Sequence, residues 1–215
     1  MKIKPKIAIV DYGVGNLRSL IRAFLYLGTH AGITEEIKEI SDSDALVLPG
    51  DGAFAAGMKG LAMRNLSKPV TEMAKLGKPV LGICLGAQIL MSEGFEFGHF
   101  KGLSLIPGQV VKFPKALGEK IPHIGWNELI LRKKVWKGTI LERIKPKSNV
   151  YFIHSYIMKP KSSSDVFAFT KYGNCEFASV IARGNIWGCQ FHPEKSGSVG
   201  LAIINNFIKI VQAHG

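Results

Sequence analysis

The chain has 215 residues, and its 28 lysines and arginines against 16 aspartates and glutamates give a formal net charge of +12. A hydrophobic content of 47% is typical of a globular protein, so we expect one well-buried domain over residues 1–215. No apolar run reaches about 18 residues, and the basic start has no signal-peptide pattern. We therefore expect a cytoplasmic protein without a membrane partner.

Basic residues are densest in residues 131–149. No nucleic-acid-binding motif accompanies them, and the nearby aromatic residues are not spaced as a stacking platform, so we expect no nucleic-acid partner. Two interpretations stay open: a solvated lysine-rich surface, or a docking face for an acidic partner.

Apolar strands and helices alternate in the first half of the chain. Residues 6–13 are an apolar run that ends in a glycine turn, and residues 16–28 carry apolar side chains on one helical face. Residues 44–52 and 78–84 are further apolar strands, with helices expected between them and over residues 85–93. This alternation is typical of a parallel sheet that is covered on both faces.

Short strand-like runs, broken by glycine, proline and asparagine, fill the second half. They cover residues 102–114, 121–131, 149–156, 166–173, 177–184 and 185–191. This pattern predicts antiparallel additions and hairpins, and residues 196–212 form a final amphipathic helix. We therefore expect an α/β fold: an open, mostly parallel twisted sheet with flanking helices and a smaller antiparallel extension.

Cys84 lies between two glycines, after an apolar strand and before a helix-like run. This arrangement forms a sharp turn that places a nucleophile at the carboxyl end of a sheet. The free N–H groups of the helix that follows favour the thiolate, and the N–H of Leu85 can receive an oxyanion. A buried, inert cysteine after a core strand is the alternative.

A cysteine hydrolase also needs a base. His192 follows an apolar strand, and Glu194 stands two residues later. The imidazole can carry the thiol proton to a leaving amine, while the carboxylate orients the ring and stabilises its charge. The sequence therefore predicts a Cys84–His192–Glu194 triad. An odd number of cysteines and no CxxC pair argue against a disulfide framework and a cysteine zinc site, and the histidines show no paired ligand spacing. We expect no metal and no cofactor.

Several motifs together carry a family resemblance. The runs "GICLGAQ" and "FHPEKSG" resemble the class I (triad) glutamine amidotransferases. The runs "IAIVDYGVGNLRSL", "LPGDGAF", "GLSLIPGQVVKF", "PHIGWNEL" and "IHSY" narrow the resemblance to glutaminase subunits of imidazole glycerol phosphate synthase. The resemblance implies hydrolysis of glutamine to glutamate and ammonia. It also implies a heterodimer in which ammonia passes through a (β/α)8 synthase subunit to form imidazole glycerol phosphate and aminoimidazole carboxamide ribotide in histidine biosynthesis.

The same resemblance assigns further positions. Residues implied to line the glutamine pocket or its oxyanion site are Gly52, Leu85, Gln88, Glu96, His154, Ser155 and Tyr156. Residues implied to face the partner subunit are Asn16, Trp126, Asn127 and Lys195. Capping or core packing is the alternative for the polar residues of the pocket.

Asp51 is a departure from the family pattern, which usually has an apolar residue at this place in the Pro-Gly-x-Gly loop. The resemblance implies that this backbone rotates so that an N–H joins that of Leu85 in the oxyanion hole, where one donor contributes about 3 to 4 kcal/mol. A carboxylate nearby would oppose the oxyanion, whereas one bonded within its own turn would have little effect. We expect weak glutaminase activity without a partner.

Other functions stay open at this point. A paralogous glutaminase subunit could supply ammonia to an enzyme that aminates surface sugars, since the acceptor lies on the other chain. The chain could also be a non-catalytic partner subunit that keeps the fold, a basic binding module, or another hydrolase with a cysteine on such a turn.

Overall fold

The computed structural model describes residues 5–115, 118–132 and 136–214. The parallel half of the sheet comes mainly from the first 83 residues. Its strands are β1 (Ile7–Val10), β2 (Ala31–Thr34), β3 (Ala45–Leu48) and β4 (Val80–Ile83). The helices between and after them are α1 (Leu17–Tyr26), α2 (Ile37–Ser41), α3 (Phe54–Met63), α4 (Ser67–Lys75) and α5 (Leu85–Ile89).

Antiparallel strands continue the same sheet. The second half of the chain contains β5 (Met91–Gly94), β6 (Phe100–Lys101), β7 (Ile106–Lys112), β8 (His123–Glu128), β9 (Ile130–Leu131), β10 (Asn149–His154), β11 (Tyr156–Pro160), β12 (Val166–Tyr172), β13 (Cys175–Arg183), β14 (Ile186–Cys189) and α6 (Gly197–His214). The order of the main path is β2-β1-β3-β4-β14-β13-β11-β7-β5-β6, and β8 and β10 form a second, two-stranded sheet. The predicted α/β architecture is confirmed, although most antiparallel strands extend the main sheet.

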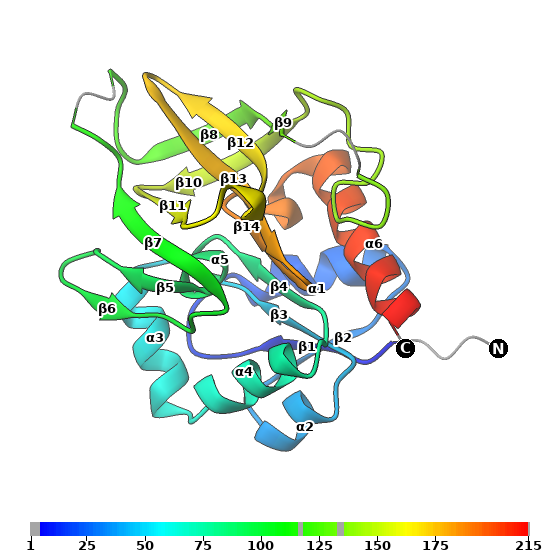
Figure 1. Ribbon diagram of the computed structural model, residues 1–215. Coiled ribbons are helices and arrows are strands. Elements are labelled where there is room, and N and C mark those ends of the chain that lie inside the picture. Colours follow the sequence, from blue (N-terminus) through cyan, green and yellow to red (C-terminus); the bar gives the residue numbers. More distant parts are fainter. Residues whose placement is uncertain (1–4, 116–117, 133–135, 215) are drawn as a thin grey trace.

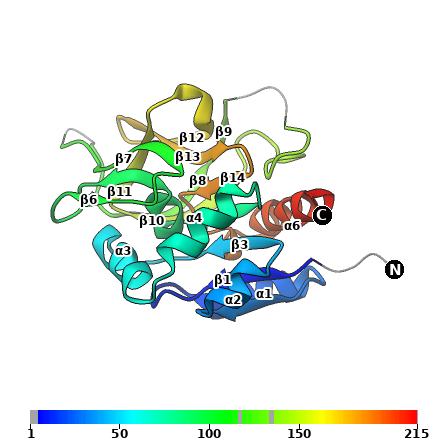
Figure 2. The same cartoon turned by 60° about the horizontal axis from the view of Figure 1, so that its bottom comes forward.

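Helices cover both faces of the parallel part, as Figures 1 and 2 show. Because side chains alternate along a strand, Ile7 and Ile9 pack with α1 and α6, whereas Ala8 and Val10 pack with α3 and α4. These two apolar layers explain the continuous apolar runs in the sequence. In the part of the chain that the structure describes, no helix is long and apolar enough to cross a membrane.

Several predicted elements differ from the observed ones. The run 121–131 is divided into β8 and β9, which belong to different sheets, and the run 185–191, expected as an antiparallel addition, contains β14, which pairs in parallel with β4. The helix expected over residues 85–93 ends at Ile89, and Met91–Gly94 instead forms β5, which pairs with β7. The run 149–156 is not one strand, because the chain leaves β10 at His154 and starts β11 at Tyr156. β10 pairs with β8, while β11 pairs with β7, so the chain changes sheets at Ser155. Strand β2 and helix α2 were not predicted.

Candidate active site

Cys84 lies on a sharp turn between β4 and α5. Its backbone has φ of 52°, a left-handed conformation that costs a non-glycine residue about 1 to 3 kcal/mol. The flanking glycines are required by close packing, since a Cβ on Gly86 would collide with the carbonyl of Leu48, and one on Gly82 would lie 2.6 Å from the Gly86 oxygen. The turn predicted from the sequence is therefore confirmed.

His192 reaches this turn from the neighbouring strand. β4 and β14 are parallel, with Cys189 paired to Ile83, so the chain leaves both strands at the same edge of the sheet. The N–H of Cys84 donates to the carbonyl of Cys189 over 2.7 Å, which joins the two strand ends. The Nδ1 atom of His192 lies 2.8 Å from Oε1 of Glu194. The structure thus brings the three predicted catalytic residues together.

The electrostatics of His192 favour a charged ring. Burial disfavours the imidazolium and lowers the pKa of His192, but the neighbouring Cys84 sulfur and the Glu194 carboxylate outweigh it and raise that pKa to about 10. The Nε2 atom is buried and has no hydrogen-bond partner within the described residues. This direction of shift favours a ring that carries a proton on Nε2, next to a group bound at Cys84.

A cavity of about 330 Å³ opens beside the sulfur. Its lining residues come from the Pro-Gly-Asp-Gly loop, the turn and helix at Cys84 and α5, the segment after β5, the residue before β8 and the change of sheets at Ser155. They are Asp51, Gly52, Ala53, Cys84, Gln88, Glu96, Pro122, Ile153, His154, Ser155 and Tyr156. All the predicted pocket residues except Leu85 are among them. The Leu85 side chain packs in the core, but its N–H begins α5, where no intrahelical acceptor exists.

Asp51 bonds to a neighbouring loop and not within its own turn. Its Oδ1 accepts from the N–H of Gly15 over 3.0 Å, and the carboxylate still borders the cavity. The hydroxyl of Tyr12 donates to the carbonyl of Pro49 in a second contact between the same two loops. The conformation of the Pro-Gly-Asp-Gly loop is therefore tied to the segment between β1 and α1.

Two side chains in the site were not predicted. Gln190 is fully buried, and its Nε2 lies 3.9 Å from the Cys84 sulfur. His123 is buried, and its Nδ1 lies 3.1 Å from Nε2 of His154. Gln190 directly precedes the motif "FHPEKSG" and His123 stands in "PHIGWNEL", but only the tertiary contacts show that their side chains point inward.

Comparison with known proteins decides the family. A family model for "Glutamine amidotransferase class-I" matches residues 8–211. The chain belongs to the class-I glutamine amidotransferases. A relative named "Imidazole glycerol phosphate synthase subunit HisH 1" in Legionella pneumophila (strain Paris) is 48% identical over 210 residues, 95% of this chain and 99% of that protein. The corresponding HisH subunit of Caldanaerobacter subterraneus subsp. tengcongensis is 44% identical over 206 residues, 96% of this chain and 98% of that protein.

Solved structures share the fold of this amidotransferase. The structure of PurLQS from Thermotoga maritima superposes with a TM-score of 0.73 at 20% identity, covering 96% of this chain and 99% of that one. A structure described as a glutamine amidotransferase superposes with a TM-score of 0.73 at 18% identity, covering 95% and 98% of the two chains.

The residues predicted to face a partner differ in exposure. Trp126 is 57% exposed, and Asn16 is exposed at the start of α1. Lys195 is half-buried directly after Glu194. The Asn127 amide points inward, because its Nδ2 donates to the carbonyl of Lys171 over 3.0 Å. Of these four predicted partner-facing residues, Trp126 and Asn16 therefore present exposed side chains, whereas Lys195 and Asn127 are half-buried.

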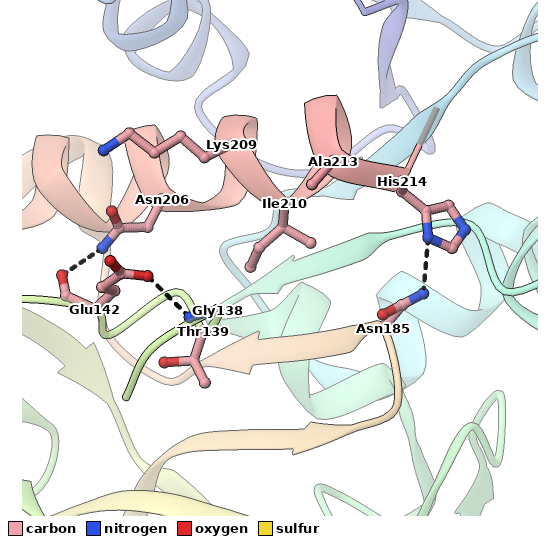
Figure 3. A pocket seen from close by; sticks show the side chains of 9 residues that line it. All are labelled: Gly138, Thr139, Glu142, Asn185, Asn206, Lys209, Ile210, Ala213 and His214. Carbon is pink, nitrogen blue, oxygen red and sulfur yellow. Dashed lines mark hydrogen bonds between the residues drawn. The ribbon is translucent and has the colours of Figure 1, made fainter. Parts of the chain in front are cut away.

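A second hollow of this amidotransferase, of about 380 Å³, lies against α6 and away from Cys84 (Figure 3). Asn206 donates to the carbonyls of Ile140 and Glu142, and the Gly138 N–H donates to the Glu142 carboxylate. The two bonds from Asn206 connect the segment before β10 to α6, and the Gly138 bond lies within that segment. Part of the basic stretch 131–149 lies outside the described residues, and within the described ranges no cluster of metal-ligating side chains is found.

Proposed function

We propose that this chain is the glutaminase subunit of an imidazole glycerol phosphate synthase, with Cys84 as nucleophile, His192 as acid and base, and Glu194 as the group that orients His192. The observation that carries the proposal is the arrangement at the carboxyl ends of β4 and β14, where Cys84 lines the cavity and the hydrogen-bonded pair of His192 and Glu194 lies next to Cys84. The synthase assignment is supported by the name and near full-length similarity of the relatives.

The first half-reaction forms a thioester. The Cys84 thiolate attacks the carboxamide carbon of glutamine, and the N–H of Leu85 donates to the oxygen that becomes negative. The C–N bond then breaks, and the leaving nitrogen takes a proton from Nε2 of His192 to depart as ammonia. The raised pKa of His192 favours the protonated ring that supplies this proton.

The second half-reaction restores the enzyme. The neutral His192 takes a proton from water, and the hydroxide attacks the thioester carbon. The C–S bond breaks, the thiolate of Cys84 is restored, and the glutamic acid formed loses a proton to solvent as glutamate. Glu194 holds the ring through Nδ1, so the same Nε2 faces the sulfur in both steps.

A synthase partner explains two surface features. Trp126 and Ile124 alternate along β8, opposite Tyr151 and Ile153 on β10, and these strands therefore present apolar side chains to solvent. A space of about 10 Å³ between the loop at Asn16 and the residues His192 and Glu194 is roughly the size of one water molecule. We infer that a (β/α)8 cytoplasmic synthase subunit covers this face and receives ammonia near this space for the lyase step of histidine biosynthesis.

The test uses the full chain mixed with a synthase subunit from the same genome. We expect glutamate release to rise when the synthase and its ribotide ligand are added, and to fall to background in Cys84→Ala. The matched control is Cys175→Ala, which removes a half-buried thiol outside the cavity and leaves the rate unchanged. Glutamate release that persists in Cys84→Ala would refute the nucleophile, and a failure to bind the synthase would refute the partner.

A further inference from the structure

Two buried glutamines connect the wall of the cavity to the Cys84 sulfur. Gln190 is completely buried after β14, and Gln88 on α5 is 4% exposed. Nε2 of Gln88 lies 3.2 Å from Oε1 of Gln190, whose Nε2 lies 3.9 Å from the sulfur. Because a buried amide without partners is costly, these contacts determine how both side chains lie.

The carbonyl of Tyr156 sets the orientation of both amides. It can only accept, so Gln88 must turn its NH₂ group toward it, and the two atoms lie 3.1 Å apart. The same NH₂ group reaches Gln190, which must therefore present its oxygen. The NH₂ group of Gln190 is then left on the side of Cys84, which fixes a donor beside the sulfur.

A histidine pair holds that carbonyl from the other side. Nδ1 of His154 lies 2.9 Å from the Tyr156 oxygen, and the Nδ1 atom of His123 lies 3.1 Å from Nε2 of His154. Burial lowers the pKa of His154 to about 3 and that of His123 to about 4, so both rings are neutral and each carries one N–H. Because the Tyr156 carbonyl can only accept, the proton of His154 lies on Nδ1, and Nε2 of His154 must then accept from Nδ1 of His123. Nε2 of His123 is therefore an acceptor, in agreement with the Asn127 amide, which lies 3.4 Å away.

The thiol and the thiolate of Cys84 have different partners. The sulfur lies 3.7 Å from the carbonyl of Ile153, which can accept the S–H proton but cannot stabilise an anion. The Gln190 amide can donate to the anion, and such a bond is stronger than one to a neutral acceptor. Since side chains two residues apart point to one side of an extended chain, Gln190 and His192 both reach Cys84 from the same segment.

We propose that Gln190 is a further functional residue of this amidotransferase, whose side-chain N–H donates to the Cys84 sulfur and stabilises the attacking thiolate. The inference rests on the proposed role of Cys84 as nucleophile. Gln190 acts on the sulfur itself, while Gln88 and the Tyr156 carbonyl position its amide.

The test is alkylation of Cys84 by iodoacetamide across a pH series, with the modified peptide quantified by mass spectrometry. Gln190→Met removes the donor at similar volume, and Gln190→Glu keeps the oxygen that Gln88 contacts but carries no N–H. We expect the pH midpoint of alkylation to rise by about one unit in Gln190→Met and by more in Gln190→Glu, because one unit is a tenfold change in the thiolate equilibrium. The kcat for glutamine should fall about tenfold, with a smaller change in KM.

Gln109→Met is the matched control, since Gln109 is exposed on β7 and its amide bonds only Glu93 among the described residues. Its midpoint and kcat should equal those of the unmodified chain. Alkylation midpoints that are unchanged in folded Gln190→Met or Gln190→Glu would show that Gln190 only packs, and would overturn the proposal. Alkylation needs no turnover, so this result is independent of whether Cys84→Ala abolishes glutamate release.

Discussion

Acidification from pH 7 to pH 5 is expected to reduce the free energy of unfolding through the buried pair His123 and His154. Burial lowers the pKa of these rings to about 4 and about 3, whereas in the unfolded chain each titrates near 6.5. A lowered folded-state pKa gives stability that is present above the unfolded value and is lost as the pH falls. At about 1.4 kcal/mol per pH unit, each ring costs about 2 kcal/mol over this interval.

His192 works in the opposite direction. Its pKa is raised to about 10, so its contribution is complete below about pH 6.5 and is lost as the pH rises through 10. Between pH 7 and pH 5 its contribution to the free energy of unfolding increases by about 1 kcal/mol. The expected net loss from the three rings is therefore about 3 kcal/mol, a large part of the stability of an ordinary domain.

The assay is urea unfolding of the free chain, followed by circular dichroism from pH 5 to pH 8. In His123→Gln and in His154→Gln, the difference in the free energy of unfolding between pH 7 and pH 5 should become smaller by about 2 kcal/mol. Each variant removes one ring that must stay neutral in the folded state. His30→Gln, at an exposed position, is the control and should keep the full pH dependence. The same pH dependence in both buried-site variants and in the unmodified chain would refute the reasoning.

Three further predictions follow from contacts around the site. Asp51→Val should raise the rate of partner-free glutamine hydrolysis about tenfold. This is less than the roughly hundredfold rate effect of one oxyanion-hole donor. An unchanged basal rate would show that the carboxylate is irrelevant. Gly86→Ala should lower the free energy of unfolding by about 3 kcal/mol because its Cβ meets the Leu48 carbonyl, while Gly32→Ala, with no atom within 4 Å of its Cβ, should change it by less than about 0.5 kcal/mol. Trp126→Ala should weaken binding of the synthase subunit about thirtyfold in calorimetric titration without altering the partner-free rate, and undiminished affinity would place the interface elsewhere.

Local residue patterns were enough to predict much of the site. The glycines around Cys84 predicted its sharp turn, and His192 and Glu194 after a second apolar strand predicted a base and its orienting carboxylate. The parallel pairing of β14 with β4, which brings them together, was not predicted, because residues 185–191 were expected to be an antiparallel addition. The continuous apolar runs predicted a covered sheet, because a strand that is buried on both faces carries apolar side chains at successive positions. The family resemblance, and not the spacing, supplied the remaining pocket residues.

Only the tertiary structure decided which polar groups meet. The end of α5 at Ile89 depends on pairing of β5 with β7, a contact between segments that no local preference encodes. The bond from Asp51 to Gly15 and the burial of Gln190 beside Cys84 join residues far apart in the chain. The sequence by itself was enough to predict Cys84 as a nucleophile and His192 as its base, because each of the two motifs is complete within a few consecutive residues. The hydrogen bonds that orient them were decided by folding, because a buried polar group must find its partner wherever the packed chain brings one.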